Sequence, residues 1–321
     1  MRLQLMSSAA PVLIVGQGLA GTLVARVCER RGRAFVIIDA GHERAASRVG
    51  AGIINPITGR RLVRTAGIEA DLPFALTAYR DWEALLGRPI LAELKVRRRW
   101  VSADEREAAR ERLTKGLLAP YVDPAAFDDE GVLIAPAWRV DTAGLIAGAR
   151  ARWLAEGRLR EATVSRDEVA GWAGPVVWCD GAGGRAHGLP LTVAAGALAT
   201  LRAPELARDG ILNRGGRWLM PSAAGGDEAL VGAVYSANDY IDAEAARAEL
   251  TAMAAGLTGG RAAGVDEVRT GLRMMGTDRR PLSGWFPGRE GFEGCLNGLG
   301  SKGALWAPRL AEEWGDRLAG A

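Results

Sequence analysis

Short apolar runs and a helical stripe alternate along the first forty residues of the chain. The run Pro11–Val15 ends at a glycine and has no polar position, which is typical of a buried parallel strand. From Gly18 to Arg31 apolar side chains recur at helical spacing, and Gly32 stands where a helix ends. A second apolar run, Ala34–Ile38, follows and is closed by Asp39. This pattern predicts a compact βαβ unit.

The rest of the chain predicts further helices and strands, with no internal repeat and no low-complexity linker. Helices are expected at 72–86, 104–113, 142–155, 243–257 and 303–318, and strands at 94–102, 176–179 and 230–235. A glycine- and arginine-rich connection is expected at 41–64. Because no linker separates the segments of this 321-residue chain, two interleaved domains are expected.

Composition narrows the classes of function. The net charge of +3 is too mild to make nucleic acid an expected partner, and the run Arg97–Arg99 is expected to be a solvated face. No apolar run reaches the roughly 18 residues that span a bilayer, so we expect a cytoplasmic protein. Three distant cysteines, expected to be buried, and two histidines give no metal site. The chemistry is therefore expected not to need histidine.

A glycine motif with G-x-G-x-x-G spacing follows the first predicted strand and opens the first helix. The residues expected to contact a dinucleotide there are Gly16, Gly18, Leu19, Ala20 and Gly21. The first glycine permits the turn, the second admits the pyrophosphate, and the third lets the helix lie on the sheet. Asp39 is placed to accept hydrogen bonds from a ribose diol, and it would repel a 2′-phosphate. The motif predicts a dinucleotide site but does not separate FAD from NAD.

Three sequence blocks together resemble the D-amino-acid oxidase and glycine oxidase group of FAD-dependent oxidoreductases. The blocks are the glycine motif continued through 46–56, the segment 176–183, and the segments 271–273, 277–284 and 297–303. Their order and rough spacing are more specific than any one block. The resemblance implies non-covalently bound FAD and an α/β fold, in which a Rossmann-type FAD-binding domain is interleaved with a mixed β-sheet substrate domain.

The resemblance also divides the chain and assigns residues to the cofactor. The FAD-binding domain is expected from 1–80, 140–190 and 265–321, and the substrate domain from 81–139 and 191–264. In the family a Ser/Gly-rich loop, a small-residue turn and a closing glycine-rich turn lie against the flavin. The matching residues here are Ser47, Gly52, Gly181, Gly300, Ser301, Lys302 and Gly303.

The implied reaction is oxidation of a primary or secondary amine, expected to be an amino acid, by hydride transfer to the flavin. Oxygen or a quinone is the expected electron acceptor. Arg273 matches the family arginine that holds the substrate carboxylate, with a structural salt bridge as the alternative. Lys302 is expected either to stabilise the reduced flavin or to face solvent. Tyr235 and Tyr240 are expected either to cap the pocket or to pack in the core.

Departures from the family pattern keep three other functions open. Met274 and Met275 follow Arg273 where the family often has proline, which leaves a non-catalytic FAD-binding protein as one alternative. The pair Asp180–Gly181 is similar to a motif of flavin aromatic hydroxylases, although no good late Gly-Asp motif accompanies it. The third alternative is an oxidase that acts on an aminomethylated nucleoside of RNA, which predicts a basic rim around the pocket mouth.

Overall fold

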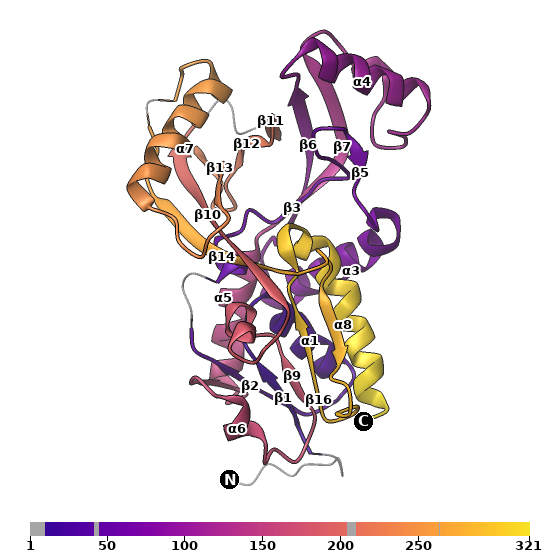
Figure 1. Ribbon diagram of the computed structural model, residues 1–321, viewed down its shortest axis with the longest axis vertical. Helices are drawn as coiled ribbons and strands as arrows, with labels where there is room; N and C mark the ends of the chain where they lie inside the picture. The colour runs from indigo at the N-terminus through magenta and orange to yellow at the C-terminus, as the bar shows by residue number, and fades with distance from the viewer. Residues whose placement is uncertain (1–9, 42–44, 204–209, 263) are drawn as a thin grey trace.

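Two large β-sheets organise the structure, a computed structural model that describes residues 10–41, 45–203, 210–262 and 264–321 (Figure 1). The first sheet has the strand order β15-β16-β9-β1-β2-β8, and all neighbours run parallel except β15 and β16. Its strands are β1 Val12–Val15, β2 Phe35–Asp39, β8 Leu159–Glu161, β9 Val176–Trp178, β15 Leu282–Trp285 and β16 Glu293–Asn297. The central place of β1 brings its carboxyl end beside those of β2 and β9, where ligands bind in open parallel sheets.

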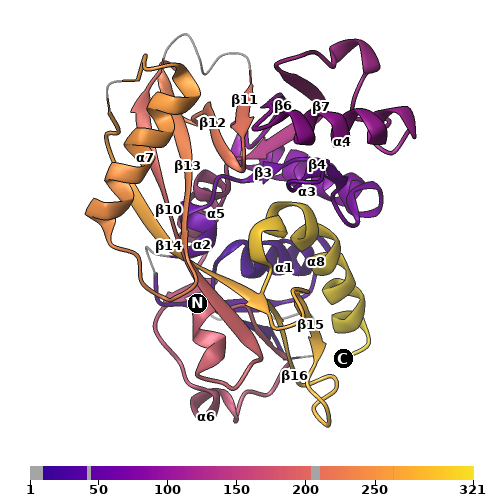
Figure 2. The same ribbon diagram turned by 45° about the horizontal axis from the view of Figure 1, so that its top comes forward.

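Helices cover this sheet because each buries one apolar stripe. Helix α1 (Leu19–Arg30) connects β1 to β2 and packs against α5 (Thr142–Ala155) and α8 (Gly303–Ala319), while α3 (Ile68–Leu86) packs against α8. The rings of Trp82 and Trp153 meet edge to face in this layer, with centroids 5.7 Å apart. Figure 2 shows α1 and α8 side by side near β15 and β16, the antiparallel pair of this sheet. This packed layer holds the loop between β1 and α1 in place.

The second sheet has eight strands in the order β14-β10-β13-β12-β11-β6-β7-β3. These strands are β3 Ile53–Ile54, β6 Leu91–Arg99, β7 Gly131–Val140, β10 Leu191–Arg202, β11 Ile211–Arg214, β12 Arg217–Pro221, β13 Glu228–Ser236 and β14 Val268–Gly276. All pairs are antiparallel except β11 and β6. The sheet is therefore mixed and combines segments from both halves of the chain.

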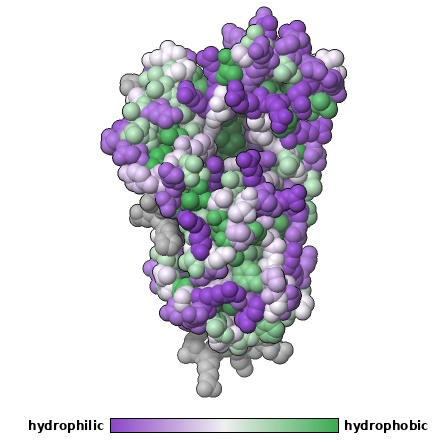
Figure 3. Space-filling model, viewed as in Figure 1, coloured by the Kyte–Doolittle hydropathy of each residue, from purple (hydrophilic) through white to green (hydrophobic). Residues whose placement is uncertain are grey.

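The two faces of the second sheet have different neighbours. Helix α7 (Ala243–Thr258) covers one face, where Leu250 and Met253 pack against apolar side chains of the strands. Trp218 and Leu230 point to the opposite face and belong to the core shared with the first sheet. The view of Figure 3 shows a hollow in the upper part of the molecule with a hydrophobic floor and hydrophilic sides. The face away from α7 is thus the one that looks toward the carboxyl ends of the first sheet.

A single segment, 45–53, connects the two edges of the second sheet. Ala45 forms a bridge with Leu272 of β14, and Ile53 of β3 pairs with Arg139 of β7. The short helix α2 (Ala46–Val49) lies between these two points and contacts β14. Edge strands far apart in sheet order are therefore joined by one short loop, which forms part of the wall of the cavity described below.

The remaining helices, strands and turns belong neither to the two large sheets nor to the helices described above. They are the hairpin β4 Ile57–Thr58 and β5 Val63–Arg64, the helices α4 Ala103–Thr114 and α6 Arg166–Val169, and the 3-10 turns η1 Pro124–Ala126, η2 Gly181–Arg185 and η3 Gly300–Lys302. Within the described residues, no helix combines the length and the apolar character that crossing a membrane requires.

The fold class predicted from the sequence is confirmed, and two local expectations change. Arg98 is not part of a solvated face, because it alternates inward on β6 and forms an ion pair with Glu105 that is almost fully buried. The glycine- and arginine-rich connection was expected without named elements, and it contains α2 and three short strands. Residues 1–9, 42–44 and 204–209 of the predicted segments lie outside the described residues.

The division into two sets of domain segments stays a prediction. Strand β14 pairs in the eight-stranded sheet, although the sequence assigned residues 265–321 to the FAD-binding domain. Strand β3 likewise pairs with β7 in that sheet, although residues 1–80 were assigned to the FAD-binding domain. Both strands enter the second sheet from loops that line the cavity, so the two predicted domains share these segments.

Candidate active site

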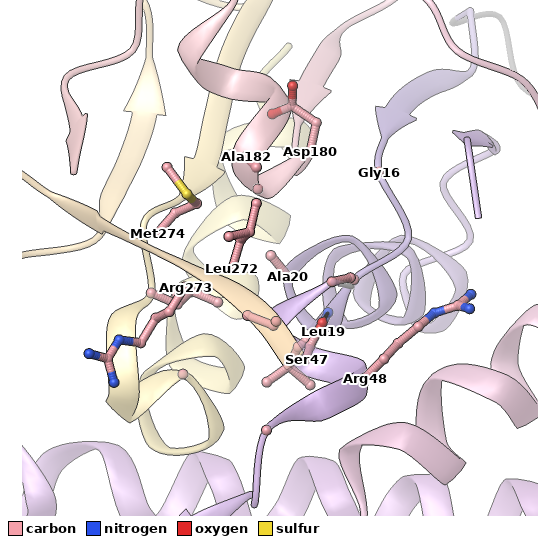
Figure 4. Close-up of a pocket in the computed structure, with 18 of the residues that line it drawn as sticks. Gly16, Leu19, Ala20, Ser47, Arg48, Asp180, Ala182, Leu272, Arg273 and Met274 are labelled. Atoms are coloured by element: carbon pink, nitrogen blue, oxygen red, sulfur yellow. Dashed lines mark hydrogen bonds between the residues drawn. The ribbon is translucent and has the colours of Figure 1, made fainter. Parts of the chain in front are cut away.

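A cavity of about 990 Å³ lies between the two sheets. Its wall is formed by the loop between β1 and α1, by α2, by the end of β9, by β10, β13 and β14, and by the turn before α8. The residues that the sequence predicted for the site all line this cavity, except Gly21, Lys302 and Tyr240. Figure 4 shows the wall with Gly16, Leu19 and Ala20 on one side and β14 crossing the other. The three sequence blocks therefore meet in one place.

The three motif glycines serve two different purposes. A Cβ on Gly16 would lie 2.5 Å from the carbonyl oxygen of Cys179, and a Cβ on Gly21 would lie 1.9 Å from that of Gly16. These two glycines are required by the packing of the protein itself. Gly18 has an ordinary φ of −81°, and its Cβ would meet only the Oγ atom of Ser47, at 3.1 Å. The missing side chain of Gly18 therefore leaves open space at the wall of the cavity.

That open space adjoins the N-terminus of α1. Gly18 gives the helix no side-chain cap, and the first turn has no acidic residue. Ser47 of α2 accepts a hydrogen bond from the Leu19 N–H at 3.1 Å. Exposed N–H groups and the positive end of the helix dipole favour an anion at such a position. The geometry fits the pyrophosphate that the motif predicted.

Asp39 is held as a carboxylate at the end of β2. Its Oδ2 accepts from the Gln17 N–H at 2.7 Å, and its Oδ1 accepts from the Gly41 N–H at 2.8 Å and from Arg150 at 2.7 Å. Burial raises the pKa of Asp39, but these three donors outweigh it and keep that pKa below its usual value. A carboxylate oxygen accepts two hydrogen bonds, so Oδ2 can still accept one from a ribose hydroxyl.

The loop around α2 carries one predicted glycine and one residue that the sequence analysis missed. Gly52 has a φ of +68°, and its Cβ would lie 1.9 Å from the Val140 carbonyl oxygen, so this glycine fixes the loop against β7. Arg48 lines the cavity, and no described carboxylate lies within ion-pair distance of it. Figure 4 shows Arg48 and Arg273 extending to opposite sides of the pocket. Nothing in the sequence distinguished Arg48 from its arginine-rich surroundings.

A second group lies at the end of β9, where the sequence analysis singled out Asp180 only as part of a hydroxylase-like motif. Asp180 lines the cavity and is 3.2 Å from the Nε2 atom of His187, while Asn297 donates to it at 3.1 Å. Burial raises the pKa of Asp180, although His187 and Asn297 act in the opposite direction. The imidazole of His187 packs on the Trp178 ring, with centroids 4.2 Å apart. The predicted Gly181 directly follows Asp180 in the chain. The sequence pattern did not reveal that Asp180 has a positioned partner, His187.

The face of the second sheet opposite the glycine motif carries the predicted substrate residues. Arg273 pairs with Ala194 of β10, and its guanidinium lies over the ring of Tyr235 at 4.7 Å. Its buried Nε has no hydrogen-bond partner, and no described carboxylate pairs with it. Trp218 supplies an apolar part of the same wall. The salt-bridge alternative is therefore absent among the described residues, and the guanidinium can accept a carboxylate from the cavity.

The two tyrosines and Lys302 are placed differently from one another. Tyr235 lines the cavity and is 57% exposed, whereas Tyr240 is 64% exposed and lies outside the lining, so neither packs in the core. Gly300, Ser301 and Gly303 line the cavity at the start of α8. The Lys302 side chain instead lies 5.3 Å from the centre of the Trp306 ring, and partial burial lowers its pKa.

Comparison with known proteins finds curated relatives and many solved structures. No family model matches the chain. A protein of Maricaulis maris described as the tRNA 5-methylaminomethyl-2-thiouridine biosynthesis bifunctional protein MnmC is 32% identical over 326 aligned residues. That alignment covers 97% of this chain and 52% of the relative, so the chain spans about half the length of that protein.

Two solved structures align over almost the whole chain. Iminodiacetate oxidase from Chelativorans sp. BNC1 superposes with a TM-score of 0.79 at 21% identity, covering 96% of this chain and 95% of that one. Glycine oxidase from Geobacillus kaustophilus gives a TM-score of 0.75 at 20% identity, covering 98% and 95%. The chain has the fold of the D-amino-acid oxidase family. The fold that the three sequence blocks predicted is therefore confirmed.

Proposed function

We propose that the protein binds FAD non-covalently in this cavity and oxidises a primary or secondary amine that carries a carboxylate. The observation that supports it most is the pairing of two features in one cavity. A dinucleotide loop with an open glycine position lies on one side, and Arg273, without a carboxylate partner among the described residues, lies on the other. Solved oxidases of amines superpose on the whole chain, which supports the same function.

The residues present fit the cofactor along its length. Asp39 can accept a hydrogen bond from the adenosine ribose, since its Oδ2 has a remaining lone pair. The N-terminus of α1 and the nearby Arg48 suit the pyrophosphate, and Gly18 leaves room for it. Gly52, beside β7, and the turn at Gly300 also line the cavity. FAD bound there would supply the hydride acceptor.

The part of the chain in the reaction is to bind and orient the amine. Arg273 can hold a carboxylate through two parallel N–H···O bonds, which fixes the adjacent carbon atom in the cavity. The ring of Tyr235 supports the guanidinium plane at 4.7 Å and limits its rotation. Trp218 keeps water from one wall. Oxygen or a quinone is the proposed electron acceptor.

The cofactor assignment is tested by what the purified protein releases. We expect yellow protein that liberates FAD, and not FMN, when it is denatured. The reason is that Asp39 and the N-terminus of α1 suit the adenosine diphosphate half of FAD. Chromatography of the released nucleotide checks this. Colourless protein that cannot be reconstituted with FAD would reject the proposed function.

A second candidate function follows from the curated relative. That protein is named for biosynthesis of a methylaminomethyl-thiouridine in tRNA, and it is 32% identical to nearly all of this chain. An aminomethylated nucleoside in RNA is also an amine, so the same cavity could oxidise it. Under this alternative, modified RNA would reduce the bound cofactor and free amino acids would not.

A further inference from the structure

Three arginines stand in one row across strands β6, β11 and β12. Arg214, the last residue of β11, lies directly opposite Arg99 of β6 and, on its other side, directly opposite Arg217 of β12. Side chains at such positions point to the same face of a sheet. Because like charges directly opposite each other destabilise a sheet, the pairing of the strands does not explain this row.

No acid of the described chain neutralises the row. Among the residues that the structure describes, no carboxylate lies within ion-pair distance of Arg99, Arg214 or Arg217, whereas both arginines that precede Arg99 on β6 form ion pairs. Guanidinium groups bind phosphate and carboxylate through paired N–H donors. The row is therefore available to an anion from outside the chain.

A pocket of about 290 Å³ lies beside the row, between the β11–β12 hairpin and the last turns of α7. Leu219, two residues beyond Arg217, packs beneath α7, whereas Trp218 lines the larger cavity. Strand residues alternate between the two faces, so this pocket lies on the face of the second sheet that looks away from the larger cavity. It is lined by two arginines of the row, by two glycines and by three apolar side chains: Arg214, Arg217, Gly215, Gly256, Val101, Met253 and Leu257.

The glycines keep the pocket rigid and open. Gly215 and Gly216 have φ angles of +61° and +86°, as a two-residue hairpin turn of type I′ requires, which fixes the strand ends that carry the arginines. Gly256 lies inside α7, where glycine is less favourable to a helix than alanine. A Cβ at Gly256 would meet no heavy atom within 4 Å beyond its own helix backbone and chain neighbours. No packing contact therefore requires glycine there, and its missing side chain leaves the pocket open.

We propose that this pocket binds a phosphate monoester whose organic body is about the size of a nucleoside. A phosphate monoester carries up to about two negative charges and three acceptor oxygens, which suits several guanidiniums better than one carboxylate does. The apolar side chains of Val101, Met253 and Leu257 suit a flat, weakly polar body such as a base. A volume of about 290 Å³ is at the small end of the range for ligand pockets. The site is separate from the proposed FAD cavity and does not depend on the proposed function.

Titration calorimetry of the FAD-saturated protein tests the proposal, because bound FAD keeps a nucleotide out of the larger cavity. The probes are AMP, adenosine and inorganic phosphate. Adenosine lacks the phosphate, and inorganic phosphate lacks the organic body. We therefore expect AMP to bind at one site and at least roughly tenfold more tightly than either of the other two.

Two variants locate the AMP site. Arg214→Gln/Arg217→Gln removes two guanidiniums and should weaken AMP binding roughly tenfold or more. Gly256→Leu should abolish AMP binding by filling the pocket, and its melting temperature without AMP should not fall, because leucine favours a helix and meets open space. The matched control is Arg60→Gln/Arg61→Gln, which removes two exposed arginines from the turn between β4 and β5 and should leave AMP binding unchanged.

Three results would overturn the inference. One is a wild-type protein that binds AMP no more tightly than adenosine or inorganic phosphate. Another is AMP binding that survives both Gly256→Leu and Arg214→Gln/Arg217→Gln, which would place the nucleotide elsewhere. The third is a wild-type protein that binds no AMP and an arginine double variant that melts at a lower temperature, as expected if these arginines only stabilise the carbonyl end of α7. A protein that binds no FAD rejects the proposed function, and the same variants then still decide this inference.

Discussion

Replacing Arg273 with alanine is expected to lower kcat/KM for the amine substrate by two orders of magnitude or more. The guanidinium has no described carboxylate partner, so its donors are available for the substrate. A hydrogen bond to a charged group is worth roughly 1.5–3 kcal/mol, and the change removes two of them. Since about 1.36 kcal/mol corresponds to tenfold in rate, the loss exceeds a hundredfold. Steady-state kinetics of the purified variant measure it.

The conservative variant and the cofactor content make this result specific. Arg273→Lys keeps the charge but cannot form two parallel hydrogen bonds to a carboxylate, so it should recover only part of the lost kcat/KM. Both variants should retain as much FAD as the parent, because Arg273 lies on the opposite side of the pocket from Arg48 and the α1 terminus. An Arg273→Ala protein with the same kcat/KM as the parent would mean that no carboxylate binds here. The alternative substrate, an aminomethylated nucleoside of RNA, would then be favoured.

Gly18→Val is expected to abolish retention of FAD in a protein that still folds. Gly18 has a φ that any residue adopts, and a Cβ there would meet only Ser47, so the apo protein tolerates the change. The branched side chain would fill the space beside the α1 N-terminus, where the pyrophosphate is proposed to bind. Absorbance of the purified variant and titration with FAD measure the loss, and circular dichroism checks the fold.

Gly21→Val is the matched comparison for Gly18→Val. A Cβ on Gly21 would lie 1.9 Å from the carbonyl oxygen of Gly16, so this variant should have a less stable fold even without the cofactor. The two neighbouring substitutions thus separate a defect in binding from a defect in folding. A folded Gly18→Val protein with normal FAD content would place the phosphates elsewhere.

The first βαβ unit was predictable because its signals are local. Apolar runs, a helical stripe and glycines at fixed spacing all occur within about thirty residues, and β1, α1 and β2 appear within one or two residues of their predicted bounds. Helix α5 has its predicted bounds. Helix α3 begins earlier than predicted, at Ile68, and runs through Pro73, although a proline inside a helix removes a backbone hydrogen bond.

The second sheet was harder to predict because its strands are defined by distant partners. Strand β10 is rich in alanine, which has low strand propensity, and it forms because β13 and β14 pair with it on both sides. Strands β7, β11 and β12 depend in the same way on pairing across the sheet. The path of each strand through this sheet could therefore not be predicted from the sequence.

The site residues that belong to a sequence motif were predictable, and those brought together only by the fold were not. The glycine motif, the loop at Ser47 and the turn at Gly300 all line the cavity as expected. Arg48 was missed, and Asp180 was singled out only for a hydroxylase-like motif, because their meaning depends on what surrounds them in space: a cavity wall for Arg48 and a histidine partner for Asp180. The roles assigned to all these residues stay predictions until the variants are measured.

The central claim is that this cavity oxidises an amine at a bound flavin, and anaerobic reduction tests it most directly. The purified holoprotein is mixed without oxygen with a panel of amino acids and N-substituted glycines, and the visible absorbance of the flavin is followed. We predict that at least one amine bearing a carboxylate bleaches the flavin, and that oxygen or a quinone restores the colour. A flavin that stays oxidised with every such amine would contradict the account.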